Sequence, residues 1–62
     1  MTNKAFMKMV DYIRQKHNIP LARFCEEIGE SKKDYEYYLK GIKTPPPWFV
    51  LKVVKYFGLE EF

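Results

Sequence analysis

The chain has 62 residues, of which 11 are lysine or arginine and 8 are aspartate or glutamate, so its formal net charge is +3. A chain of this length makes one domain and buries only roughly 60% of the surface that its unfolded form exposes. That leaves little room for an enclosed active site. The mild basic charge permits a nucleic acid as partner without requiring one.

Aromatic residues are frequent, with five tyrosines, five phenylalanines and one tryptophan. A few such large side chains fill the core of a small helical domain. The single cysteine, Cys25, cannot form an internal disulfide, and its place among apolar residues at helical spacing predicts a reduced, buried thiol. We therefore expect a cytoplasmic protein.

Neither a signal peptide nor a membrane span is expected. Lys4, Lys8 and Asp11 interrupt the apolar residues near the N-terminus, so no signal-peptide core forms there. The longest apolar stretch, around Trp48 to Leu51, is far too short to cross a bilayer.

The first helix is predicted to begin near Thr2 or Asn3 and to end at about Lys16 or His17. Proline at position 20 favours an end to this helix, because the residue before a proline is pushed out of the helical region. Apolar residues at spacings of three and four predict a buried stripe. The stripe consists of Phe6, Met9, Val10 and Ile13.

Two short helices are predicted on either side of Gly29, which can take the left-handed conformation that ends a helix. Ser31 is a good N-cap for the second helix, expected from about Lys32 to Lys40 and ended by Gly41. The apolar face of the first helix consists of Leu21, Phe24, Cys25 and Ile28. That of the second consists of Tyr35, Tyr38 and Leu39.

A proline-containing connector and a fourth helix complete the chain. The helix is expected to start near Pro46 or Pro47, since proline suits a first helical turn, and to end at Gly58. Its buried residues are expected to be Val50, Val53, Val54 and Phe57, with Leu51 on the flank and Leu59 folding back on the core. Residues 1–62 thus read as one all-α domain of four compactly packed helices, with or without a short fifth.

The spacing from Tyr12 to Leu59 resembles that of the phage repressor/Cro-type (Xre-like) helix-turn-helix family. That family has a small residue midway along its second helix, a glycine four residues later, an apolar residue six beyond that, and a glycine, basic residue and proline before its fourth helix. Those places here hold Cys25, Gly29, Tyr35, Gly41, Lys43 and Pro45. The resemblance implies a lambda-repressor-like fold with its helix-turn-helix at about residues 20–40.

The resemblance also implies a function. A small transcriptional regulator of a phage or mobile element would bind double-stranded DNA by placing the helix at about residues 32–40 in the major groove. Base contacts then fall to Lys32, Lys33, Glu36 and Tyr37. Phosphate contacts fall to Arg23, Ser31, Lys40 and Lys43. The alternative for Lys32 and Lys33 is that they are ordinary solvated surface charges.

Some positions depart from the family pattern. Leu39 replaces a glutamate that pairs with an arginine of the first helix in many relatives, so Arg14 needs another partner or solvent. Glu30 replaces the usual apolar turn residue. Between residues 30 and 40, three lysines are balanced by three carboxylates. The recognition helix is therefore neutral, and useful affinity is expected to come from a dimer or from a partner.

The rival prediction is a helix-turn-helix module that binds a protein, as an antirepressor or adaptor does. Its interface, or that of a homodimer, would include Trp48, Phe49 and Phe62. Tyr35 and Tyr38 are expected in the core, with base stacking as the alternative. No enzyme, metal, cofactor or small-molecule ligand is expected, because His17 and Cys25 do not share a helical face and no glycine-rich phosphate loop occurs.

Overall fold

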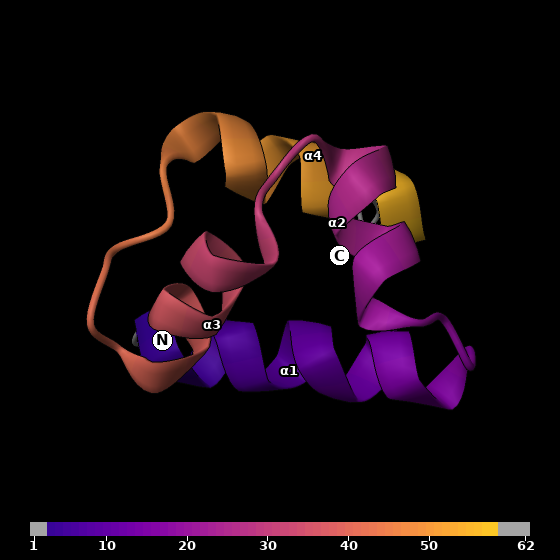
Figure 1. Ribbon diagram of the computed structural model, residues 1–62, viewed down its shortest axis with the longest axis horizontal. Coiled ribbons are helices and arrows are strands. Elements are labelled where there is room, and N and C mark those ends of the chain that lie inside the picture. Colours follow the sequence, from indigo (N-terminus) through magenta and orange to yellow (C-terminus); the bar gives the residue numbers. More distant parts are fainter. Residues whose placement is uncertain (1–2, 59–62) are drawn as a thin grey trace.

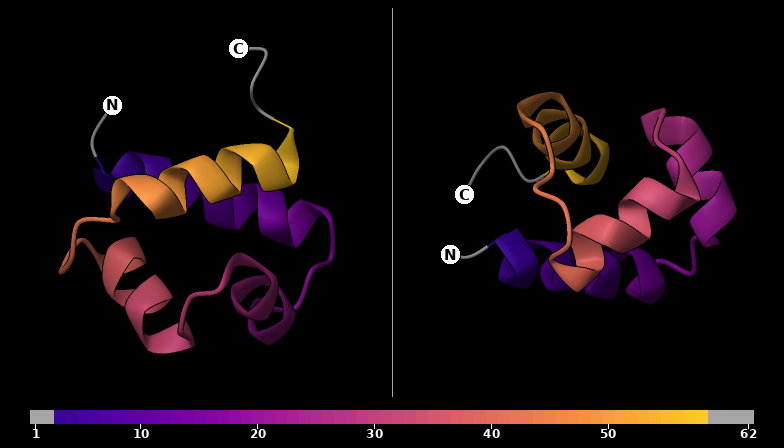
Figure 2. Two further views of the ribbon diagram at one scale, coloured as in Figure 1. Left: turned by 90° about the horizontal axis from the view of Figure 1, so that it is seen from above. Right: turned by 60° about the vertical axis from the view of Figure 1, so that its left-hand side comes forward.

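The computed structural model describes residues 3–58 and contains four helices. These are α1 (Asn3–Lys16), α2 (Leu21–Ile28), α3 (Lys32–Lys40) and α4 (Pro47–Phe57) (Figure 1). Helices α2 and α3 lie on one side of the molecule, and α1 and α4 lie on the other (Figure 2). The predicted all-α, four-helix class is confirmed. Thr2, Leu59 and the short fifth helix lie outside the described residues.

A residue in the left-handed backbone conformation follows each of the four helices. Gly29 follows α2 with φ 86° and ψ 29°, and its N–H donates to the Cys25 carbonyl at 2.8 Å. Gly41 and Gly58 end α3 and α4 in the same conformation. Asn18, with φ 56°, does this for α1, since asparagine tolerates the left-handed region better than most residues. The predicted helix ends are confirmed, and asparagine before Ile19 and Pro20 accounts for the first.

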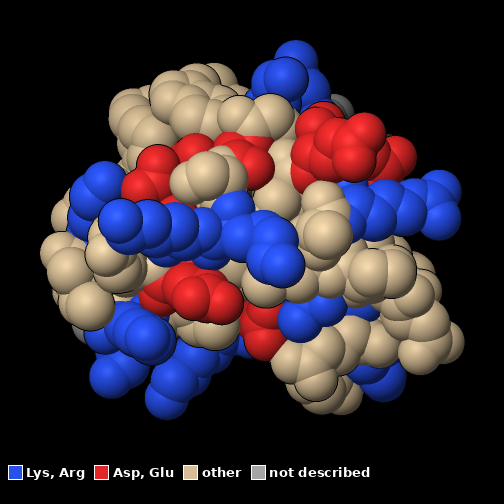
Figure 3. All heavy atoms as spheres, in the orientation of Figure 1, with Lys and Arg blue, Asp and Glu red and all other residues tan. Residues whose placement is uncertain are grey.

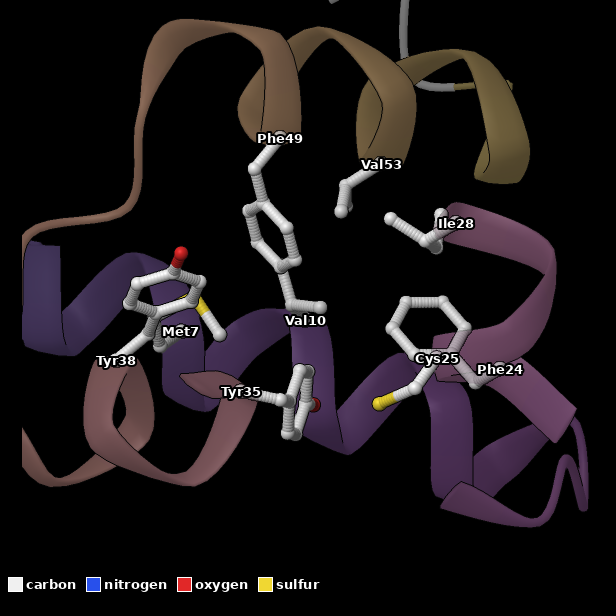
Figure 4. Close-up of a cluster of buried hydrophobic side chains, with 9 residues drawn as sticks. All are labelled: Met7, Val10, Phe24, Cys25, Ile28, Tyr35, Tyr38, Phe49 and Val53. Atoms are coloured by element: carbon white, nitrogen blue, oxygen red, sulfur yellow. The ribbon is translucent and has the colours of Figure 1, made fainter. Parts of the chain in front are cut away.

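The core joins all four helices through nine buried side chains (Figure 4). They are Met7, Val10, Phe24, Cys25, Ile28, Tyr35, Tyr38, Phe49 and Val53. Phe24 lies between α3 and α4, with its ring centroid 5.7 Å from that of Tyr35 and 5.5 Å from that of Phe57. The predicted burial of Cys25, Tyr35 and Tyr38 is confirmed.

The predicted faces of α1 and α4 are partly wrong. In α1, Met7 is completely buried, whereas Phe6, Met9 and Ile13 are only half-buried. The buried face is rotated toward Asp11 and Arg14, two polar residues that hydrophobic periodicity assigns to solvent. In α4, the fully buried residues are Phe49 and Val53, and Val50, Val54 and Phe57 lie at the edge of the core. Leu51 is 61% exposed.

A polar network explains why the buried face of α1 includes Asp11. The Tyr35 hydroxyl of α3 donates to Asp11 Oδ1 at 2.8 Å, and Gln15 Nε2 donates to Asp11 Oδ2 at 2.6 Å. Arg14 forms an ion pair with Asp11 at 3.0 Å and donates from a second nitrogen to the Ile19 carbonyl at 2.7 Å. Arg14 thus has its partner on its own helix.

The network shifts two pKa values. Partial burial by itself raises the pKa of Asp11, but the hydrogen bonds from Tyr35, Gln15 and Arg14 together hold it below its ordinary value of 3.8. Burial, followed by the hydrogen bond to the Asp11 carboxylate, raises the pKa of Tyr35. Both shifts favour a neutral phenol beside an ionised carboxylate at neutral pH.

Replacing Tyr35 by phenylalanine removes one donor to a carboxylate while leaving the ring in the core. We expect the free energy of unfolding at neutral pH to fall by about 1.5–3 kcal/mol, measured by urea unfolding. Tyr12→Phe is the matched control, because Tyr12 is 60% exposed, and a change within about 0.5 kcal/mol is expected.

Acid should reduce the difference in the free energy of unfolding between the wild type and Tyr35→Phe. A depressed pKa contributes stability that is present above the unfolded-state pKa and is lost as the pH falls through the folded-state pKa. The gap between the wild type and Tyr35→Phe should therefore narrow as the pH falls below 3.8. An equal gap at neutral and acid pH would mean that Asp11 is not the acceptor that matters.

Substitution of Gly29 tests the turn between α2 and α3. A Cβ at this position would meet nothing within 4 Å, so its cost is conformational rather than steric. We expect Gly29→Ala to lower the free energy of unfolding by about 1 kcal/mol and Gly29→Asn to cost less, because asparagine tolerates positive φ. Equal losses from both variants would contradict this explanation.

Candidate nucleic-acid interface

The candidate interface is the solvent face of α3. It points away from the core because Tyr35 and Tyr38 are buried on the opposite face of this helix. The side chains predicted to contact bases lie on this face: Lys32, Lys33 and Glu36 are exposed, and Tyr37 is half-buried. Ser31 caps the helix by accepting from the Asp34 N–H at 3.1 Å. Lys40 is exposed at the other end of α3.

Tyr37 lies between two lysines. The Lys33 Nζ atom is 5.7 Å from the centroid of the Tyr37 ring, and the Lys43 Nζ atom is 5.6 Å from it. Cation–π contacts at exposed sites contribute about 0.5–1 kcal/mol each. Two predicted base contacts and one predicted phosphate contact therefore form a single cluster of an aromatic ring and two ammonium groups.

The return of Lys43 to α3 follows from the turn at Gly41. The N–H groups of Ile42 and Lys43 both donate to the Tyr37 carbonyl, at 2.9 and 3.2 Å. The chain thus reverses over the last turn of α3. The sequence carries a signal for this reversal, the glycine at the helix end, but does not show which ring Lys43 would contact.

Lys43 also forms an ion pair, with 3.0 Å between its Nζ atom and Asp34 Oδ1. The hydrogen bond from Lys43 is the main reason why the pKa of Asp34 is lowered. Such surface pairs contribute little free energy, because solvent screens both charges. Contact of Lys43 with a phosphate would require exchange of one weak partner for another.

Glu30 has structural partners. Its Oε2 atom accepts from the Tyr38 hydroxyl at 2.7 Å, and its Oε1 atom accepts from the Ser31 N–H at 3.0 Å. A carboxylate at a helix N-terminus is favoured by the helix dipole. The Glu30 carboxylate therefore stabilises the start of α3. Burial and the Glu30 carboxylate together raise the pKa of Tyr38 to about 12.

The charged side chains around the interface have mixed signs. Arg23 is exposed and lies 3.6 Å from Glu27, whose carboxylate also accepts from the Tyr56 hydroxyl at 2.7 Å. Figure 3 views the molecule from the side that carries α2 and α3, and shows basic side chains interleaved with acidic ones. Two of the predicted phosphate contacts, Arg23 and Lys43, are thus ion-paired in the free protein.

The predicted protein interface has to be corrected at Phe49. This side chain is completely buried, with its ring centroid 5.1 Å from that of Tyr38, because α4 turns this position into the core. It therefore cannot line an exposed surface. Trp48 is 44% exposed, in agreement with its predicted position at the surface, and Phe62 lies outside the described residues.

Among residues 3–58, no group of three or more histidine, cysteine, aspartate or glutamate side chains is arranged to hold a metal ion. Nor does any helix there combine the length and the apolar character needed to span a bilayer.

Comparisons of the chain with protein-family models, with curated proteins and with solved structures gave no significant match.

The Tyr38 to Glu30 hydrogen bond predicts a response to alkali. We expect Tyr38→Phe to lower the free energy of unfolding by about 1.5 kcal/mol near neutral pH. A raised folded-state pKa contributes stability below the unfolded-state pKa of 10.0 that is lost as the pH rises toward about 12. Guanidinium unfolding should thus show the gap from the wild type narrowing over this range. A constant difference in the free energy of unfolding between the two proteins would rule out the Tyr38 hydroxyl bond to Glu30 as the cause of the difference.

Proposed function

We propose that this protein binds duplex DNA and acts as a small transcriptional regulator, with α3 placed in the major groove. The observation that carries the proposal is the cluster of Lys33, Tyr37 and Lys43 on the solvent face of a capped helix that follows a three-residue turn. Two short helices joined by a glycine-containing turn form the usual frame for presenting such a helix to DNA.

Each side chain of the interface has a role in this proposal. Lys32 and Lys33 donate to guanine O6 and N7, and Glu36 accepts from cytosine N4. Tyr37, held between two lysines, offers its ring to a thymine methyl group and its hydroxyl to a base edge. Side chains at the margins contact phosphates and fix the register of the helix. These are Arg23, Ser31, Lys40 and Lys43.

The charges favour modest affinity. Residues 30–43 contain four lysines and three carboxylates, so few phosphates are neutralised without exchange of internal ion pairs. Binding of two copies to adjacent half-sites, as in Cro-like regulators, would raise the affinity. We place the protein in the cytoplasm, which agrees with a reduced Cys25 and gives access to DNA. The proposed role is that of a regulator of a phage or mobile element.

The second candidate is a protein-binding module that uses the same face of α3. It is favoured by the ion pairs of Arg23 and Lys43, which leave the interface less basic than its lysine content suggests. A protein partner would contact Tyr37 and Glu36 directly and would not require excess positive charge.

A salt titration separates the two candidates. Labelled random-sequence duplex is titrated with the protein at several salt concentrations. DNA binding predicts that the logarithm of the association constant falls with the logarithm of salt, with a slope of roughly 0.9 per phosphate neutralised. No binding at the lowest salt would sink the DNA proposal and leave the protein module.

Lys33→Ala tests base contact. On a duplex selected from random sequences, we expect a loss of about 1–3 kcal/mol in binding free energy. Lys52→Ala is the matched control, because Lys52 is exposed on α4, on the other side of the molecule, and it should bind as the wild type does. Equal losses for Lys33→Ala on every duplex would make Lys33 a phosphate contact instead.

A further inference from the structure

Helix α4 has an unusual composition for a helix at the surface. Apart from Lys52 and Lys55, its eleven residues are apolar or aromatic. One face is buried through Phe49 and Val53. The opposite face carries both lysines together with two exposed apolar side chains, Trp48 and Leu51. Exposed apolar side chains that lie together mark interaction surfaces.

This free face, here called the outer face of α4, consists of Trp48, Leu51, Lys52 and Lys55. Trp48 and Leu51 are 44% and 61% exposed, and both lysines are exposed. The spacing of three, four and seven residues places all four side chains along one stripe. Apolar and basic groups thus alternate on a single helical face.

Lys52 and Lys55 have no acidic partner among residues 3–58, as also holds for the lysines on α3. What distinguishes Lys52 and Lys55 is their place beside Trp48 and Leu51. Two ammonium groups next to exposed apolar side chains are complementary to a surface that offers carboxylates and apolar side chains together.

We propose that the outer face of α4 is a docking surface for an acidic amphipathic helix of a partner protein. A second copy of this chain is a poorer occupant, because a two-fold interface would bring the lysines of both copies together. A bilayer is a poorer occupant too. Around the helix, Lys55 lies between Leu51 and Trp48, so insertion of the two apolar side chains would carry an ammonium group with them.

The outer face is separate from the interface on α3, because α4 and α3 lie on opposite sides of the molecule (Figure 2). Docking of an acidic helix on α4 therefore leaves α3 free. The proposal stands whether α3 binds DNA or a protein.

Trp48 provides the measurement, since it is the only tryptophan of the chain. The probe is a synthetic peptide about two heptads long, crosslinked to hold it helical, with leucines on one face and glutamates beside them. We expect saturable binding with a blue shift of the Trp48 emission. A peptide with lysine in place of each glutamate should not bind, and a peptide of the same composition with dispersed leucines should bind about tenfold more weakly.

Two variants test the residues of the outer face. Leu51→Ala should weaken binding of the acidic peptide about tenfold. Lys52→Glu should weaken it at least as much, and the lysine-containing peptide should then bind this variant better than the wild type. Both side chains are exposed, and thermal unfolding followed by circular dichroism checks that the variants fold. Lys16→Glu on α1 is the control, because Lys16 is exposed on another helix, and this variant should bind the acidic peptide normally.

Four results would overturn the proposal. They are no response to the acidic peptide at any accessible concentration, unchanged binding by both Leu51→Ala and Lys52→Glu, a Trp48 response only to anionic phospholipid vesicles, and a concentration-dependent dimer in sedimentation that shields Trp48. Addition of duplex DNA should leave the Trp48 emission unchanged. A DNA-induced shift in place of the peptide response would assign the outer face to nucleic acid instead.

Discussion

The hydrogen bond from the Tyr35 hydroxyl to Asp11 determines how α3 lies on α1. The Tyr35 ring fills the core between Phe24 and Phe49, and its hydroxyl reaches a carboxylate that Arg14 and Gln15 also hold. Apolar packing alone would tolerate rotation of α3 about its axis, because its buried face consists of similar tyrosine rings. A directional bond between two helices removes that freedom. The side chains that face solvent on α3 follow from it.

Much of the charge of α3, and of the turn before it, takes part in contacts within the protein. Glu30 accepts hydrogen bonds from the Ser31 N–H and the Tyr38 hydroxyl, and Asp34 accepts one from Lys43. These contacts fix the start of α3 and bring Lys43 to the Tyr37 ring, but they also offset the positive charge that a DNA surface requires. The contacts that stabilise α3 thus reduce the attraction of its surface for phosphate. This reduction explains why a protein with net charge +3 is expected to bind DNA modestly.

The sequence predicted the elements well because their ends depend on local chemistry. Gly29, Gly41 and Gly58 have the positive φ expected of them, and Ser31 caps α3. It predicted the faces of α1 and α4 less well. Burial of Met7 depends on a polar network across 24 residues of sequence, which hydrophobic spacing cannot reveal. Phe49 is wrongly predicted at an interface, because aromatic residues occur on both faces of α4 and periodicity alone does not distinguish its core face from its free face.

The sequence predicts which side chains of the candidate site face solvent on α3, but it does not predict the contacts that they make within the protein. The exposure of Lys32, Lys33 and Glu36 followed from helical spacing once Tyr35 and Tyr38 were assigned to the core. The contacts of Lys43 were not predicted, since they depend on the path of the chain after Gly41. The role of Glu30 is also missed. Its partner Tyr38 lies eight residues further along the chain, and the spacing of apolar residues does not reveal this contact.

We propose that the fold presents α3, and not α4, to duplex DNA. A titration of the ¹⁵N-labelled protein with random-sequence duplex at low salt, followed by amide chemical shifts, tests this placement. We expect the perturbed amides to lie in Ser31 to Lys43 and those of Lys52 and Lys55 not to move. Perturbations centred on α4, or none at a large excess of duplex, would contradict it.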